Sequence, residues 1–279
     1  MTTDQPAFHA AANGGKAGPL PFDTSVANQA RIYDYLLGGK DNYAADRAAA
    51  EAALKIYPDG AFTARANRSF LGRAVRYLAA EQGIRQFLDV GTGIPTGGNI
   101  HQVAQAIAPE TRVMYVDYDP IVLAHSRALL NSHQAGATDY IQADVRDSAT
   151  IIDRAGQLLD LSQPVAVTLV AILHAIPDSD DPFAVVARLL AALPAGSYLA
   201  VSHLASDVLE EGTQEDLETT TTPMFQQHFT YRSKADVGRL FTGLDLVDPG
   251  IVRLEEWRPD PAAAESGRSI CWCAVGRKP

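Results

Sequence analysis

The clearest chemical feature of the sequence is a glycine-rich turn that follows a short apolar segment. Residues 86–90 are typical of a buried strand, Gly91 and Gly93 come directly after it, and a helix is expected to begin near Gly97 or Gly98. Glycines at such a turn let the backbone bend sharply and let a ligand approach it closely. On its own the turn fits two interpretations equally well, a ligand-binding loop and a plain strand-to-helix connection.

The spacing inside this turn argues against a pyrophosphate ligand. A dinucleotide-binding loop carries a third glycine or alanine three residues after the second. Thr96 stands at that position here, and it follows Pro95, which has no backbone N–H to donate. No Gly-Lys-Ser/Thr follows either, so the turn is not a P-loop.

Three aspartates stand at the ends of three consecutive predicted strands, namely Asp89, Asp117 and Asp144. In an open α/β sheet, the carboxyl ends of the strands border the ligand crevice. A carboxylate after the second strand can accept both hydroxyls of a ribose, and one after the third can accept from an adenine amino group. Each aspartate alone is more often a cap or a turn residue. Together with the glycine turn, the three match an adenosine without phosphates, and acidic groups also suit a sulfonium cation.

These residues need an α/β sheet to position them. After Gly83, short apolar segments alternate with stretches of helical periodicity, and the apolar segments are residues 86–90, 113–116, 139–143, 165–173 and 197–204. This alternation predicts a mostly parallel sheet covered on both faces. Two further strand-like segments, 244–247 and 270–275, are joined by a long loop without helical periodicity, so one strand near the C-terminus is expected to run antiparallel.

The chain before this sheet has a different composition. We expect a disordered tail over residues 1–20, an N-terminal helical cap or lid over 21–82, and an α/β domain over 83–279. Residues 31–47 combine tyrosines and aspartates with the glycine pair at 38–39, which predicts a lid over the ligand that also contacts the acceptor. The lid residues expected to do so are Tyr33, Asp34, Asp41, Asn42 and Tyr43. A capping helix stabilised by its own ion pairs is the alternative.

The turn and the acidic strand ends resemble those of class I S-adenosylmethionine-dependent methyltransferases. Further segments narrow the resemblance to an actinobacterial family of predicted S-adenosyl methyltransferases, long catalogued as a domain of unknown function. The segments are residues 32–47, 65–68, 89–96, 115–125, 173–178 and 257–260, and the resemblance covers nearly everything from about residue 21 onward. Tyr118 and Ala175 depart from the family pattern, which has Asn or Asp and Phe there. These departures bear on the shape of the pocket.

The resemblance implies a Rossmann-like class I methyltransferase fold. That fold has a mostly parallel seven-stranded sheet with one antiparallel terminal strand, here with an N-terminal helical cap. The implied cofactor is S-adenosylmethionine, or its product S-adenosylhomocysteine. The residues expected to bind it are Asp89, Gly91, Thr92, Gly93, Asp117, Tyr118, Asp144, Val145 and Asn67.

Two histidines are the candidate catalytic groups. His174 follows the fourth predicted strand and His203 lies near the end of the fifth, and these strands are neighbours in the expected order. Either imidazole could act as a general base if the acceptor must lose a proton. The alternative, which we favour, is that each histidine only hydrogen-bonds a loop. No set of His, Cys, Asp and Glu has metal-ligand spacing, so no metal is predicted.

Composition limits the partners. The chain has 23 Lys and Arg against 33 Asp and Glu, a net charge of −10, which argues against a general nucleic-acid binder. The sequence has no apolar segment near the roughly 20 residues of a membrane helix and no secretory signal at its start, so we expect no membrane partner and a cytoplasmic location. The expected partner is a small-molecule acceptor, and the sequence leaves the oligomeric state open.

Three functions compete at this point. The leading one is methyl transfer to a small molecule. The second is a non-catalytic module that binds S-adenosylmethionine or S-adenosylhomocysteine as a sensor or scaffold, since no catalytic base is assured. The third, a nicotinamide-dependent oxidoreductase, is disfavoured by Pro95 and Thr96. Residues 219–222, four consecutive threonines, lie after the fifth strand, where acceptor-specific insertions are expected.

Overall fold

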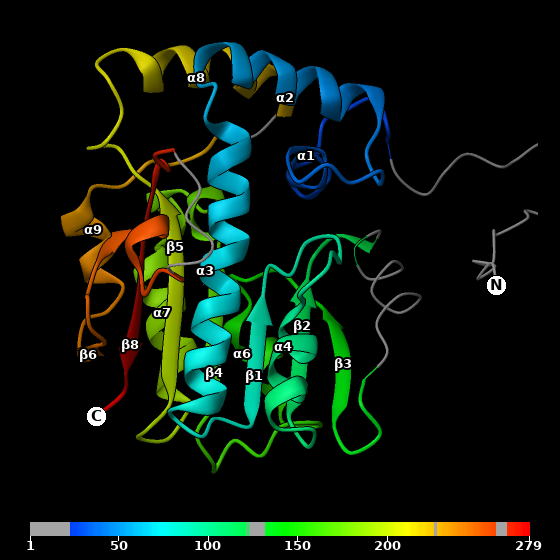
Figure 1. Cartoon of the computed structure of the whole chain (residues 1–279), viewed down its shortest axis with the longest axis vertical. Coiled ribbons are helices and arrows are strands. Elements are labelled where there is room, and N and C mark those ends of the chain that lie inside the picture. The colour runs from blue at the N-terminus through cyan, green and yellow to red at the C-terminus, as the bar shows by residue number, and fades with distance from the viewer. Residues whose placement is uncertain (1–22, 121, 123–131, 226–227, 261–266) are drawn as a thin grey trace, which may run out of the picture.

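The molecule is built on one twisted sheet with helices on both faces and a helical cap over one edge (Figure 1). The computed structural model describes residues 23–120, 122, 132–225, 228–260 and 267–279. The tail predicted over residues 1–20 lies outside the described residues. Within these ranges, no helix is both long enough and apolar enough to cross a membrane.

The sheet has the strand order β3-β2-β1-β4-β5-β8-β6, and β7 pairs with β8 beside this path. The parallel strands are β1 (Gln86–Val90), β2 (Arg112–Asp117), β3 (Ala137–Gln142), β4 (Ala166–Val170) and β5 (Tyr198–Leu204). The strand β8 (Cys271–Arg277) runs antiparallel to β5 and pairs with β6 (Asp245–Leu246) and β7 (Val252–Arg253). The predicted mostly parallel sheet with an antiparallel C-terminal strand is confirmed. The sheet has an eighth strand, β7, which was not predicted because two residues are too few to show a hydrophobic periodicity.

Alternating side chains of the strands divide the core between the two faces. Phe87 of β1 packs with α3 (Gly60–Ala80) and α4 (Ile100–Ile107) on one face. The adjacent Leu88 packs with α6 (Ser148–Ala155) and α7 (Pro182–Ala191) on the other, where α9 (Lys234–Arg239) also contributes. Both faces are therefore covered, and only the strand ends are left to form a crevice.

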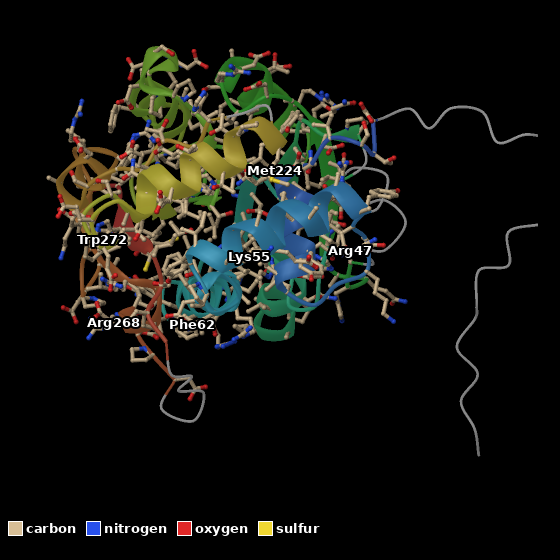
Figure 2. All side chains as sticks on the ribbon, turned by 90° about the horizontal axis from the view of Figure 1, so that it is seen from above. Arg47, Lys55, Phe62, Met224, Arg268 and Trp272 are labelled. Carbon is tan, nitrogen blue, oxygen red and sulfur yellow. The ribbon has the colours of Figure 1, made fainter. Side chains whose placement is uncertain are left out.

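Three helices form the cap above the carboxyl ends of the parallel strands: α1 (Gln29–Leu36), α2 (Ala44–Ile56) and α8 (Thr213–Phe225). The helices α2 and α8 lie side by side when the molecule is seen from above (Figure 2). A small apolar cluster holds the cap together, with Ile32 of α1, Ala49 and Ala50 of α2, and Phe225 of α8. Segments far apart in the sequence thus cover one edge of the sheet.

A buried carboxylate fixes the cap in place. Asp46 in α2 is fully buried and accepts hydrogen bonds from the Arg31 Nε at 2.8 Å, the Asn28 backbone N–H at 2.9 Å and the Tyr43 backbone N–H at 2.7 Å. The Arg31 side chain is itself buried, and its Nη2 donates to the Val26 carbonyl. The described part of the cap thus contains one buried ion pair, Arg31–Asp46, a contact of the kind that the capping-helix interpretation expects.

The helix α3 links the cap to the sheet. Tyr33 of α1 donates from its hydroxyl to the Ala64 carbonyl of α3, whereas Phe70 and Leu78 of α3 pack in the core on the sheet. The helix α3 therefore contacts both the cap and the sheet. The division into a cap over residues 21–82 and a domain over residues 83–279 stays a prediction.

Candidate functional site

The conformation of the glycine turn after β1 is fixed by a hydrogen bond to the end of β2. Gly91 and Gly93 both have positive φ, +80° and +66°, which favours glycine at each position. The backbone N–H of Gly93 donates to Asp117 Oδ2 at 2.9 Å. A Cβ at Gly93 would meet nothing within 4 Å, whereas one at Gly91 would lie 2.6 Å from the Ile172 side chain. Gly91 therefore makes room for Ile172, and Gly93 borders open space.

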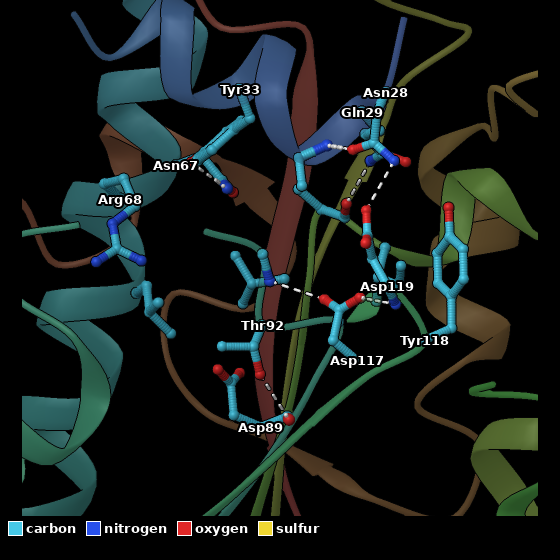
Figure 3. A pocket seen from close by; sticks show the side chains of 17 residues that line it. Asn28, Gln29, Tyr33, Asn67, Arg68, Asp89, Thr92, Asp117, Tyr118 and Asp119 are labelled. Carbon is cyan, nitrogen blue, oxygen red and sulfur yellow. Dashed lines mark hydrogen bonds between the residues drawn. The ribbon is translucent and has the colours of Figure 1, made fainter. Parts of the chain in front are cut away.

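That open space is a cavity whose lining includes carboxylate, amide and guanidinium side chains, and we call it the polar cavity (Figure 3). Its walls include the turn, the ends of β1 and β2, the start of α1 and one side of α3. Lining residues include Asn28, Gln29, Tyr33, Asn67, Arg68, Asp89, Thr92, Gly93, Asp117, Tyr118 and Asp119. Asp117 Oδ1 accepts from the Asp119 backbone N–H at 3.0 Å, and Asn28 Nδ2 donates to Asp119 Oδ2 at 3.1 Å. The cap and the sheet thus meet at this cavity.

Asp89 has the most strongly perturbed carboxyl group in the polar cavity. It is 7% exposed and accepts a hydrogen bond from the Thr168 hydroxyl of β4. Burial raises its pKa to about 6, although the Thr168 hydrogen bond acts in the opposite direction. The pKa of Asp117 is also raised, again chiefly by burial. Both carboxyl groups lie where a positive ligand would favour their charged forms.

Asp144 lies apart from the other two predicted aspartates. It lines a neighbouring groove together with Val145, Arg146 and Asp180. This groove and the polar cavity share the lining residues Gly91, Asp117 and Tyr118. The Asp144 carboxylate forms an ion pair with Arg146, and this contact lowers the pKa of Asp144. The same Arg146 guanidinium also forms an ion pair with Asp180. The Tyr118 side chain is 55% exposed beside this groove. The sheet therefore brings the three aspartates to one crevice, with Asp144 already engaged by a cation.

A second cavity, which we call the apolar cavity, lies under the cap. It encloses about 190 Å³. Its walls come from α1, α2, α3 and α8, from the turn after β4 and from the start of β8. Its lining residues include Ile32, Leu36, Ala53, Leu54, Tyr57, Leu217, Phe225, Phe229, Tyr231 and Cys271. None of the lining residues that the structure describes is Lys, Arg, Asp or Glu.

Four residues line both cavities: Gln29, Tyr33, Asn67 and Ala171. The Tyr33 hydroxyl accepts a hydrogen bond from Asn67 Nδ2 at 2.9 Å, and Ser202 donates to Asn67 Oδ1 at 2.6 Å. Gln29 Nε2 donates to the Ala171 carbonyl at 3.0 Å. These hydrogen bonds fix the polar side chains at the junction of the cavities.

The two histidines come together as expected, but only one faces a cavity. Their rings are edge to face with centroids 5.9 Å apart. His174 lines the apolar cavity, and its Nε2 lies 2.7 Å from Gln29 Nε2. His203 lines neither cavity, and Arg232 and the Leu204 carbonyl engage its two ring nitrogens. Burial lowers the pKa of His174 to about 3 and that of His203 to about 4. The geometry thus argues against His203 as a catalytic base.

Of the five predicted lid residues, the structure places Tyr33 alone at the described cavities. Asp34 is buried, and its Oδ2 accepts from the Asp41 backbone N–H and from Asn42 Nδ2, so it shapes the turn between α1 and α2. Tyr43 lies at the start of α2 with its ring under the Arg31 guanidinium. The other four lie outside the described cavities, and their contact with the acceptor stays a prediction, because polar and aromatic composition cannot tell a turn from a pocket wall.

Several described residues at or beside the polar cavity were not predicted as site residues. The polar ones include Asn28 and Gln29 at the start of α1, Asp119 after β2, and Thr168 in β4. One signal was available for Asn28, because asparagine is a favoured N-cap, and it does accept from the Ala30 and Arg31 backbone N–H groups. Asp119 lies in the segment 115–125 that carries the family resemblance, whereas nothing local marked Gln29 and Thr168.

Comparison with known proteins identifies one family. The S-adenosyl methyltransferase family model matches residues 16–279. A DUF574 family protein from Streptomyces avermitilis is 45% identical with a TM-score of 0.88, over 92% of this chain and 99% of that one. A proposed methyltransferase from Thermobifida fusca is 40% identical with a TM-score of 0.82, over 92% and 96%. No curated protein matches the chain.

A more distant structure agrees in fold. The plantazolicin methyltransferase BpumL, solved with a triazolic desmethylPZN analog and S-adenosylhomocysteine, has a TM-score of 0.53 at 11% identity over 89% of this chain and 95% of that one. The predicted family, fold and cofactor are confirmed, and the comparisons do not support the alternative of a non-catalytic module. The chain belongs to the S-adenosyl methyltransferase family and is an S-adenosylmethionine-dependent methyltransferase.

Proposed function

We propose that the chain transfers the methyl group of S-adenosylmethionine to a small-molecule acceptor held in the apolar cavity. One observation carries this proposal: a polar cavity lined by carboxylates and an apolar cavity without charge share a wall at Gln29, Tyr33 and Asn67. A reaction between a polar cofactor and an apolar acceptor needs such a junction. The apolar cavity of about 190 Å³ and the net charge of −10 both favour a small molecule over nucleic acid.

The polar cavity and the neighbouring groove at Asp144 offer a separate place for each part of the cofactor: the ribose, the adenine and the methionine end. We assign the ribose hydroxyls to Asp117, the adenine to the groove beside Tyr118, Asp144 and Val145, and the methionine end to the side of Asn67 and Arg68. The open space above Gly93 lets the cofactor approach the turn closely. When bound, S-adenosylmethionine supplies a methyl group that its sulfonium has already activated.

The residues of the chain then act mainly by positioning and by excluding water. Asp46 holds the start of α1 over the strand ends, so Asn28 and Gln29 close the polar cavity from above. The apolar walls keep water from the acceptor, and a closed site of fixed geometry supplies much of the rate in a displacement reaction. In this proposal the start of α1, at Asn28 and Gln29, covers the cofactor, directly before the lid predicted over residues 31–47.

The direct test is turnover with a matched pair of variants. Wild-type protein incubated with S-adenosylmethionine and a cell metabolite extract should release S-adenosylhomocysteine, measured by mass spectrometry. Ala53→Phe, which fills the apolar cavity, should reduce this release at least about tenfold, whereas Ala48→Phe on the exposed face of the same helix should not. Equal turnover in both variants would contradict an acceptor in this cavity.

The pH dependence of cofactor affinity should follow Asp89. A cationic ligand favours the ionised carboxylate, whose pKa in the free protein is about 6. Calorimetry should therefore show S-adenosylmethionine binding about tenfold more weakly near pH 5 than near pH 7. Since the folded-state pKa lies above the ordinary 3.8, this group stabilises the folded chain as the pH falls from about 6 towards 4. The weaker cofactor binding at low pH could therefore not be explained by an unfolding of the chain caused by protonation of Asp89.

Two variants check this origin. Asp89→Asn should flatten the pH profile. Thr168→Val removes the hydroxyl that favours the ionised carboxylate and should move the midpoint to higher pH. A wild-type profile retained in Asp89→Asn would assign the titration to another group.

Gly93→Val should weaken cofactor binding at least about tenfold. The positive φ strains a β-branched residue by about 1–2 kcal/mol, and the new side chain would project into the open space of the polar cavity. Gly243→Val is the matched control, because Gly243 has φ +80° and open space around it but lines none of the described cavities. Equal affinities in the two variants would show that Gly93 only makes a turn.

A further inference from the structure

The apolar cavity limits the charge of its occupant. Its described lining residues include aromatic, aliphatic and hydroxyl side chains but no ionic ones. An ion buried without a partner is strongly disfavoured and becomes neutral instead. The part of the acceptor that enters this cavity is therefore uncharged.

The adjoining polar cavity disfavours one sign of charge in particular. Asp89 and Asp117 lie there, and both are more than nine-tenths buried. An anionic acceptor atom near the junction would face these carboxylates through a medium that screens them poorly. Carboxylate and phenolate acceptors are thus less compatible with this site than neutral ones.

The hydrogen bonds of Gln29 determine the protonation of His174. Gln29 Nε2 lies 3.0 Å from the Ala171 carbonyl, which can only accept, so this end of the amide is the NH₂ group. The same nitrogen lies 2.7 Å from His174 Nε2, which must accept the second hydrogen. The proton of a neutral His174 therefore lies on Nδ1, which has no partner among the described residues. Both ring nitrogens of a neutral His174 are thus occupied, Nε2 by the hydrogen bond from Gln29 and Nδ1 by its own proton, so no free lone pair is left to take a proton.

The other titratable side chains of the apolar cavity are equally unsuited to act as bases. Burial raises the pKa of Tyr33, Tyr57 and Cys271 to about 12 each, and raises that of Tyr231 as well. All four keep their protons near neutral pH. These side chains therefore offer no base to an acceptor atom in this cavity, which must attack without first losing a proton to them.

We propose that the acceptor is an uncharged, largely aromatic nitrogen compound, methylated on a neutral amine or ring nitrogen. This inference rests on the proposed function. The nitrogen lone pair forms the new bond to the methyl carbon, the carbon–sulfur bond breaks, and its electron pair stays on sulfur. One positive charge moves from sulfur to nitrogen, so no new charge is created. Any proton on the methylated nitrogen leaves to water after release.

Aromatic surfaces in the cavity support a flat occupant. The Phe229 ring contacts Phe225 and His174 edge to face, with centroids 5.1 Å and 5.2 Å apart. All three residues line the cavity. An aromatic occupant could pair with these rings in an offset-stacked or edge-to-face arrangement, which aromatic groups prefer.

Three two-ring probes test the acceptor class: quinoline, 2-naphthol and 2-naphthoate, at about pH 7.5, where quinoline and 2-naphthol are neutral and 2-naphthoate is an anion. Calorimetry on protein saturated with S-adenosylhomocysteine should show quinoline binding at least about tenfold more tightly than 2-naphthoate. With S-adenosylmethionine, mass spectrometry should detect N-methylquinolinium. Equal or tighter binding of 2-naphthoate, faster methylation of 2-naphthol, or no methylation of quinoline would overturn the proposal.

Matched variants separate this inference from the proposed function. Ala53→Phe should abolish quinoline binding and keep S-adenosylmethionine binding within about twofold, whereas Ala48→Phe should keep both. Quinoline binding that persists in Ala53→Phe would overturn the acceptor site. Failure of the wild-type chain to bind S-adenosylmethionine would instead overturn the proposed cofactor site, whatever the probes do.

Discussion

Asp117→Ala is expected to weaken binding of S-adenosylmethionine about a hundredfold. Two hydrogen bonds from ribose hydroxyls to a charged group contribute about 1.5–3 kcal/mol each, and about 1.4 kcal/mol corresponds to a factor of ten. The carboxylate also accepts from the backbone N–H groups of Gly93 and Asp119, so its loss loosens the turn and the end of β2. Isothermal titration calorimetry measures the change.

Asp139→Ala is the matched control for this experiment. Asp139 lies in β3, is exposed and lines none of the described cavities, so its removal changes the net charge equally without touching the site. The control should bind the cofactor as the wild type does. If both variants bind equally well, Asp117 is not the ribose ligand.

Asp46→Ala is expected to lower the free energy of unfolding by about 3–5 kcal/mol, because it leaves the buried Arg31 guanidinium without its partner. The backbone N–H groups of Asn28 and Tyr43 lose their acceptor as well. Urea denaturation followed by circular dichroism measures this change. Cofactor affinity should fall too, because Asn28 and Gln29 line the polar cavity.

Two further variants identify the cause. Glu51→Ala, on the exposed side of α2, removes only a hydrogen bond from the Tyr35 hydroxyl and should change stability by less than about 1 kcal/mol. Adding Arg31→Met to Asp46→Ala should restore part of the lost stability, since no unpaired charge then stays buried. A double variant less stable than Asp46→Ala alone would show that Arg31 does not need this partner.

The sheet could be predicted because its signals are local. Parallel strands buried on both faces have continuous apolar segments, and β1 was predicted at its observed bounds, Gln86–Val90. The glycine turn and Asp117 follow from the same reasoning, since they lie at strand ends. The two glycines of the turn have different roles, one in packing and one at the cavity, which the sequence alone does not distinguish. Gly91 is needed to clear Ile172, and Gly93 borders the polar cavity.

The apolar cavity could not be predicted, because distant segments form it. Its roof includes α8, a helix with four consecutive threonines and an internal proline, which has low intrinsic propensity and depends on packing through Leu217 and Thr221. The hydrogen-bond partners of Asp34 could not be predicted for a related reason. A buried aspartate that accepts from the turn after α1 has the same sequence appearance as one that faces a ligand.

A crystal structure of the chain grown with S-adenosylhomocysteine would test the central claim most directly. We expect both ribose hydroxyls within hydrogen-bond distance of the Asp117 carboxylate and the adenine in the groove beside Val145. The sulfur should lie at the junction formed by Gln29, Tyr33 and Asn67 and face the apolar cavity. A ligand whose ribose lies away from Asp117, or whose sulfur faces away from the apolar cavity, would contradict it.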